Sequence, residues 1–288
     1  MIVIRFIVAL VVSLVVVVTA ASFIYNALTS DANVPVRQLW KGKFVEADGV
    51  LTAYREWGTS GPPIVLVGGF LEPTFVWQDV GPRLAAAGHR VYALDLDGFG
   101  YSERRGPSTL QEWADQVEAF SRALGLAKPE VVGHSLGAAV AVEVARRGFA
   151  SRAVLLDGDG LRSGGPPRLA GKVLAHTPFL TSAIRLLTGW DWAAKRILKS
   201  AYAPNRLPLD ATEINRWTDQ FRAKDARKGL ERIARNGIVG FSRFELKRMK
   251  IKALVVWGAE DSVDNGTAGR ASARDLGAQF VEIPGAGH

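Results

Sequence analysis

The stretch VVGHSLGAA, residues 131–139, decides the fold, because it places a serine between two glycines directly after an apolar run. Gly133, Ser135 and Gly137 fit the pattern G-x-S-x-G, and the flanking segments are typical of a strand before the motif and a helix after it. A sharp turn from strand to helix strains the serine backbone, so the residues two positions away must be small. The motif therefore predicts a raised Ser135 hydroxyl at the end of a strand, beside the first N–H groups of a helix.

Segments of strand and helix character alternate on both sides of this motif. Asp48-Gly49 lies between two strand-like runs and predicts the turn of a hairpin. Thr109 and Glu112, three residues apart before an amphipathic run, predict the N-terminus of a helix. Short apolar runs that read as further strands are PIVLV, VYALD, PEVV, AVLL, ALVV and QFVEI. The alternation predicts an α/β fold with a mainly parallel sheet and helices on both faces.

The alternation breaks between residues 161 and 250, where the pattern is mostly helical. This segment holds 19 Lys and Arg against 7 Asp and Glu, whereas the rest of the chain holds 17 against 21. We therefore predict a core formed by residues 43–160 and 246–288, with a helical cap of residues 161–245 inserted after the sixth strand. A basic cap surface would suit an anionic membrane, although solvated helix faces explain it more simply. Nucleic acid is not expected as a partner, since no nucleic-acid-binding motif accompanies the charge.

The first 28 residues form an apolar run in which Arg5 is the only charged residue. About 20 such residues suffice to cross the hydrocarbon core as a helix. We predict a transmembrane anchor at residues 1–28 and a linker at residues 29–42. A signal peptide cleaved near residues 19–22, which would leave the protein exported, is the alternative. Basic residues lie on both sides of the run, so the side of the membrane is left open.

A serine hydroxyl needs a base to remove its proton, and the chain has four histidines. His134 adjoins the serine and points elsewhere on a tight turn. His89 precedes a strand, at the edge opposite the catalytic loops, and His176 lies in the cap. His288 follows the last strand and a PGAG loop, so it is predicted as the base.

The base needs a carboxylate to hold its tautomer. Asp261, three residues past Gly258 at the end of the ALVV strand, is the preferred candidate. Asp264 nearby, and Asp157 and Asp159 after the AVLL strand, remain alternatives.

An acyl-transfer site also needs donors for the oxyanion. The backbone N–H of Leu136, at the start of the helix, is one expected donor. The second is expected from the loop after PIVLV, at Phe70, with Leu71 less favoured. The sequence contains no cysteine, which excludes thiolate nucleophiles, disulfides and zinc–thiolate sites. Neither a cofactor nor a metal is expected.

The motifs VGGF, DLDGFGYSE, GHSLGAA, WGAEDSVD and PGAGH, in this order, resemble the α/β-hydrolase fold, and within it the capped serine esterases, lipases and C–C hydrolases. The resemblance implies that Ser135, Asp261 and His288 form a catalytic triad. Two features depart from the family. Gly68-Gly69 replaces the usual His-Gly, whose histidine often braces the oxyanion loop. The family also continues past its catalytic histidine with a helix, so the sequence is expected to be a truncated form.

The cap is expected to roof an apolar pocket, or to pack its aromatic residues between its own helices. The residues in question are Phe179, Leu180, Trp190, Trp192 and Trp217. Leu71, Trp77 and His134 are predicted to contact substrate beneath it. We therefore expect hydrolysis of an apolar or lipid-like ester through an acyl-enzyme. A C–C hydrolase, a cofactor-free haloperoxidase and a binding protein without turnover are the alternatives.

Overall fold

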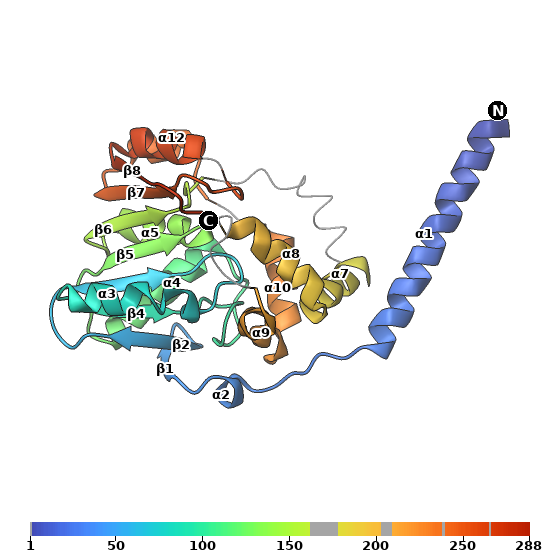
Figure 1. The fold of residues 1–288 in the computed structure, drawn as a ribbon, viewed down its shortest axis with the longest axis horizontal. Coiled ribbons are helices and arrows are strands. Elements are labelled where there is room, and N and C mark those ends of the chain that lie inside the picture. The colour runs from blue at the N-terminus through green and yellow to red at the C-terminus, as the bar shows by residue number, and fades with distance from the viewer. Residues whose placement is uncertain (1, 162–177, 203–208, 238–239, 265) are drawn as a thin grey trace.

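The computed structural model describes residues 2–161, 178–202, 209–237, 240–264 and 266–288. Its centre is an eight-stranded sheet in the order β1-β2-β4-β3-β5-β6-β7-β8 (Figure 1). The strands β1 and β2 pair antiparallel, as do β2 and β4, and every other neighbouring pair is parallel. The strands are β1 (Lys43–Ala47), β2 (Val50–Trp57), β3 (Pro63–Val67), β4 (Arg90–Leu94), β5 (Glu130–His134), β6 (Arg152–Leu156), β7 (Ala253–Gly258) and β8 (Gln279–Ile283).

Local sequence signals account for several of these elements. Asp48 and Gly49 have positive φ angles of 52° and 71°, which a tight hairpin turn between twisted strands requires. Thr109 caps α4 in a reciprocal capping box with Glu112. β3 is buried along four of its five residues, as expected of a strand covered on both faces.

Helices cover both faces of the sheet. α4 (Leu110–Ala123), α5 (Leu136–Arg146) and α12 (Gly266–Leu276) enclose the larger hydrophobic core, and α3 (Val80–Ala86) encloses a smaller one. The short helices α2 (Val36–Leu39) and η1 (Thr74–Trp77) lie in connections. The predicted α/β fold is confirmed.

Helices also fill the interval between β6 and β7. They are α7 (Pro178–Gly189), α8 (Asp191–Ala201), α9 (Ala211–Thr218), η2 (Asp219–Arg222), α10 (Ala226–Asn236) and α11 (Arg243–Arg248). This confirms a helical insertion after the sixth strand. α11 packs on α12 and crosses residue 246, so the exact limits of the cap remain a prediction.

A single long helix, α1 (Ile2–Leu28), projects from the body (Figure 1). Its residues Arg5–Leu28 have a mean hydropathy of 2.9 and are almost entirely unburied. Among the described residues, α1 is the helix long and apolar enough to cross a membrane.

Candidate active site

Ser135 lies at the turn between β5 and α5, with φ 50° and ψ −117°. Its backbone N–H donates to Leu156 O in β6, which ties the turn to the sheet. A Cβ at Gly133 would lie 1.9 Å from Gly137 O, and one at Gly137 would lie 2.5 Å from Val67 O. Glycine at both positions is therefore what allows this turn to form.

The loop after β3 lies directly against Ser135. A Cβ on Gly69 would lie 2.9 Å from the Cβ of Ser135. The Phe70 N–H in this loop and the Leu136 N–H at the start of α5 have no backbone acceptor within the described residues. Leu71 has a positive φ of 63°, and its carbonyl accepts a hydrogen bond of 2.8 Å from Gln220 Nε2 in η2. Backbone strain of this kind often occurs at functional sites.

Glu72 braces this loop, a role that the sequence analysis missed. Its Oε2 accepts the Gly69 N–H at 2.6 Å and the Nδ1–H of His134 at 2.7 Å. This partly buried carboxylate braces the loop at Gly68-Gly69, where the resembled family has a histidine. The one signal in the sequence was an acidic residue three positions after Gly69.

His134 is a buried cation held between two acceptors. Besides Glu72, its ring contacts the backbone oxygen of His288, 2.7 Å from Nε2. Both partners accept hydrogen bonds, so both ring nitrogens must carry protons. Burial alone would lower the pKa of His134, but the Glu72 carboxylate raises it to about 9. Burial raises the pKa of Glu72, but the charge and hydrogen bond of His134 outweigh it and hold that pKa below its usual value.

Asp261 and His288 meet across the loops that follow β7 and β8. His288 Nδ1 donates to Asp261 Oδ2 at 2.8 Å, and both side chains are buried. The other oxygen of Asp261 accepts the N–H groups of Val263 and Asp264. Burial raises the pKa of Asp261, but the His288 hydrogen bond and these donors bring it below its ordinary value. The arrangement fixes the tautomer that leaves Nε2 of His288 free to accept a proton.

The alternative carboxylates have other partners. Asp157 Oδ1 accepts the Gly258 N–H at 2.6 Å, which joins the ends of β6 and β7. Asp159 Oδ1 accepts the Leu161 N–H at 2.8 Å. Asp264 directs its N–H at Asp261. Asp261 is the carboxylate that accepts the hydrogen bond of the His288 ring.

His288 lies beside the turn that carries Ser135, but it forms no hydrogen bond with that serine. Its ring centroid is 4.7 Å from that of His134, the residue before Ser135. Within the described ranges, the Ser135 hydroxyl makes no hydrogen bond to His288 or to another side chain. The same part of the chain holds no His/Cys/Asp/Glu cluster suited to a metal ion.

Two of the three residues expected to contact substrate are engaged in other contacts. Trp77 is 3% exposed and packs in the smaller core with Ile64 and Leu66, a position that does not favour the substrate contact predicted for it. His134 has both ring nitrogens engaged, which does not fit the substrate contact predicted for it. Leu71 is partly buried against the larger core, in the loop beside Ser135.

The aromatic residues of the cap lie in different surroundings. Trp190 and Trp192 are 49% and 62% exposed, so neither is packed inside the cap. The ring of Trp217 packs edge-on against Phe75, 5.1 Å between centroids. His176 lies outside the described residues. The roof that the cap was expected to form over an apolar pocket stays a prediction.

Comparisons with known proteins agree with this architecture. A family model described as alpha/beta hydrolase family matches residues 64–288. The uncharacterized hydrolase YugF of Bacillus subtilis is 28% identical over 222 residues, which cover 75% of this chain and 79% of that protein.

Two solved structures share the fold at 22% identity. A meta-cleavage product hydrolase from Pseudomonas fluorescens superimposes with a TM-score of 0.69, over 86% of this chain and 90% of its own. A membrane phospholipase A also superimposes with a TM-score of 0.69, over 99% of this chain and 92% of its own. With the family model matched over most of its length, the chain belongs to the alpha/beta hydrolase family.

Proposed function

We propose that the protein is a serine hydrolase that cleaves carboxylic esters through an acyl-enzyme. The observation that carries this proposal is the buried Asp261–His288 pair next to the strained turn of Ser135. In this mechanism, Ser135 Oγ attacks the ester carbonyl while its proton moves to His288 Nε2. The free N–H groups of Phe70 and Leu136 stabilise the oxyanion.

The same groups complete the turnover. His288 returns the proton to the departing alkoxide, which leaves as an alcohol, and Ser135 keeps the acyl group. Water then attacks the acyl-enzyme, with His288 again accepting the proton, and releases the acid. Hydrogen bonds between nucleophile and base are often long before substrate binds, which accommodates the gap between Ser135 and His288.

Glu72 and His134 serve as positioning residues in this proposal. Through Gly69, Glu72 holds the loop that presents Phe70, and through His134 it holds the backbone of His288. One carboxylate thereby connects the oxyanion loop to the proposed base. A misplacement of about 1 Å in such a site can cost about 10²-fold in rate.

We expect Glu72→Gln to lower kcat by up to about 10²-fold with little change in KM, because geometry rather than binding is lost. The variant removes the charge that raises the pKa of His134. In the wild type this pair stabilises the fold fully below pH 6.5, and the contribution is lost as pH rises through about 9. The variant should lack that alkaline drop in Tm.

Glu130→Gln is the matched control, since Glu130 pairs with Arg152 at the surface, away from the site. It should leave both kcat and the alkaline change in Tm as they are. Equal kcat for Glu72→Gln and the wild type would remove the positioning role.

The proposed substrate is an apolar, lipid-like ester. Phe70 is 43% exposed beside Ser135, and the apolar helix α1 lies against the cap. The experiment is a series of nitrophenyl esters of increasing acyl length, assayed with the full chain. We expect kcat/KM to rise with length, by up to about 15-fold for two added methylenes, because each buried CH₂ contributes about 0.8 kcal/mol.

A flat or acetate-only profile would remove the lipid-like substrate but leave an esterase. Absence of ester hydrolysis, together with cleavage of a C–C bond in a meta-cleavage product, would favour the alternative activity of the structural neighbour.

The proposal places the protein at a membrane, held by α1 as an uncleaved anchor. The length and apolar character of Arg5–Leu28 support it. A signal peptide has the same composition, so the discriminating measurement is the mass of the mature chain recovered from membranes. A chain beginning near residues 19–22 would contradict the anchor.

A further inference from the structure

The cap helix α7 has its apolar side turned outward. Ala183, Leu186 and Leu187 lie at helical spacing on α7 and are exposed, and Trp190, which directly follows the helix, is exposed as well. Leu187 and Trp190 are about half exposed, at 50% and 49%. A surface helix of a water-soluble protein normally buries this stripe and exposes its polar side. On α7, Ile184 packs against the larger core, but the stripe of Leu186 and Leu187 is left exposed.

The polar side of α7 is turned inward, against α1. Ser182 Oγ donates to Asn26 Oδ1 at 3.2 Å, and Asn26 Nδ2 donates to Pro178 O at 3.0 Å. The guanidinium of Arg185 donates to Asn26 O at 2.8 Å and to Thr29 Oγ1 at 2.9 Å. Polar contacts inside and apolar side chains outside are typical of helices that pack together in lipid.

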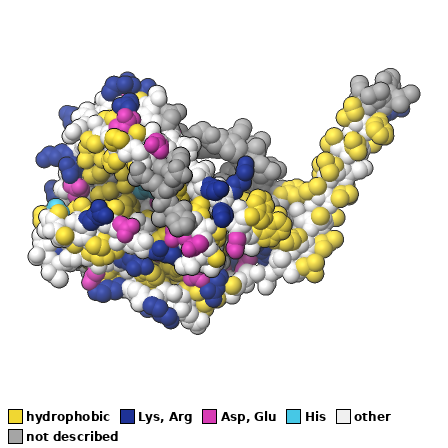
Figure 2. All heavy atoms as spheres, viewed as in Figure 1, with side chains coloured by type: hydrophobic (Ala, Val, Ile, Leu, Met, Phe, Trp, Pro, Cys, Tyr) yellow, Lys and Arg dark blue, Asp and Glu magenta, His cyan; other side chains and the backbone are white. Residues whose placement is uncertain are grey.

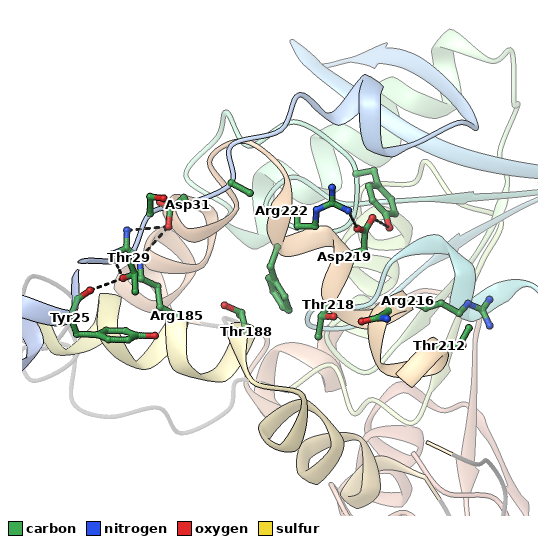
Figure 3. A pocket seen from close by; sticks show the side chains of 16 residues that line it. Tyr25, Thr29, Asp31, Arg185, Thr188, Thr212, Arg216, Thr218, Asp219 and Arg222 are labelled. Carbon is green, nitrogen blue, oxygen red and sulfur yellow. Dashed lines mark hydrogen bonds and ion pairs between the residues drawn. The ribbon is translucent and has the colours of Figure 1, made fainter. Parts of the chain in front are cut away.

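The close-up in Figure 3 shows Arg185 of α7 directed toward Thr29 and Asp31 at the end of α1, at a hollow of about 950 Å³ that Thr188 also lines. Tyr25 of α1 and Thr29, which directly follows that helix, line the same hollow. The polar groups of α7 and of the end of α1 thus meet where the two helices are in contact.

The next helix, α8, presents a different exposed side. Trp192, Lys195, Arg196 and Lys199 lie at helical spacing and are all exposed. The rings of Trp190 and Trp192 lie together, 5.9 Å between centroids. Tryptophan and basic residues are enriched where a protein meets lipid headgroups. Figure 2 shows hydrophobic side chains on α1 and on the adjoining part of the cap, with Lys and Arg close by.

We propose that α7 and the first turn of α8 lie in the bilayer interface beside α1, with Leu186, Leu187, Trp190 and Trp192 among the lipid chains. Lys195, Arg196 and Lys199 then meet anionic headgroups. The occupant of this surface is lipid because α7 is hydrogen-bonded to the helix that enters the bilayer, which holds the apolar side at the same depth. The proposal rests on α1 being an anchor and is independent of catalysis by Ser135.

The absence of cysteine makes a direct test possible, because each introduced cysteine is the only one in the chain. Leu187→Cys and Trp192→Cys would be labelled with an NBD fluorophore in the full chain, reconstituted in phosphatidylcholine–phosphatidylglycerol vesicles. We expect emission shifted to the blue, quenching by nitroxide-bearing lipids, and protection from aqueous iodide.

Val80→Cys on α3 and Phe244→Cys on α11 are matched controls, since both replace exposed apolar side chains away from this surface. Their labels should be quenched by iodide and not by the nitroxide lipids. Val15→Cys, on the exposed middle of α1, reports separately whether the anchor is inserted.

Lipid quenching at residue 15 together with iodide quenching at 187 and 192 would overturn the proposal and keep the anchor. No lipid quenching at residue 15 would overturn both. Protection of 187 and 192 from both quenchers, with energy transfer between copies, would assign the surface to a second copy of the chain and also overturn the proposal.

Discussion

Replacing Ser135 with alanine is expected to lower kcat for a nitrophenyl ester by about 10⁵–10⁶-fold, as removal of a triad nucleophile does elsewhere. The substitution removes the one oxygen that can form the acyl-enzyme. The backbone should keep its turn, because Gly133 and Gly137 make room for it and Ser135 N–H bonds to Leu156 O. The measurements are kcat at saturating ester and labelling by a fluorophosphonate probe, which should disappear.

Ser102 offers the matched control, since it is also a serine in a Gly-containing loop. It is fully buried, accepts the Ala53 N–H at 2.9 Å and donates to Asp95 O at 2.6 Å. Ser102→Ala should cost about 1–3 kcal/mol of stability through the unpaired groups, while the folded fraction keeps its labelling. Labelling that persists in Ser135→Ala would contradict the assignment, and no labelling of the wild type would favour a binding protein.

Local patterns in the sequence predicted the features that depend on contacts between residues close together in the chain. The glycines around Ser135 are required by contacts within the turn itself, and Asp48-Gly49 fixes its hairpin by its own backbone angles. The same holds for the capping box of Thr109. Such features depend on a few residues that are close in sequence, so the spacing of those residues is enough to predict them.

The remaining parts depend on contacts between distant segments. Glu72 and His134 are 62 residues apart, and no spacing rule connects them. Trp77 was predicted to contact substrate. The core in which it packs depends on the path of the loop before it, which the sequence does not reveal. The outward apolar side of α7 follows from its hydrogen bonds with α1, about 155 residues away in the chain.

Helix α8 connects the proposed lipid surface with the loops of the proposed active site. Its first residue, Asp191, lies between Trp190 and Trp192 at the proposed lipid surface. At its other end, Ser200 O accepts the hydroxyl of Ser262, next to Asp261, and Ala201 O accepts the His288 N–H at 2.9 Å. One helix of 11 residues therefore joins the proposed lipid surface to the loops that carry the proposed acid and base.

Replacing Asp261 with asparagine is expected to lower kcat by about 10⁴-fold, because the amide no longer fixes the His288 tautomer or stabilises its cation. The backbone donors of Val263 and Asp264 still have an amide oxygen to bind, so the loop should keep its form. The wild-type carboxylate has a lowered pKa, so its stabilising contribution is present above pH 3.8 and is lost as pH falls through the folded-state value. Asp261→Asn should lack that acid-side loss of Tm.

Asp157→Asn makes the comparison sharp, since Asp157 lies at the end of the neighbouring strand and is also buried. Its partner is the Gly258 N–H, which an amide oxygen can still satisfy, so kcat should fall by less than about tenfold. Burial raises the pKa of Asp157, so its loss should not reduce stability at low pH in the way the loss of Asp261 does. A larger kcat defect in Asp157→Asn than in Asp261→Asn would transfer the role of acid to the end of β6, because only the residue that holds the His288 imidazole can have the larger effect on proton transfer.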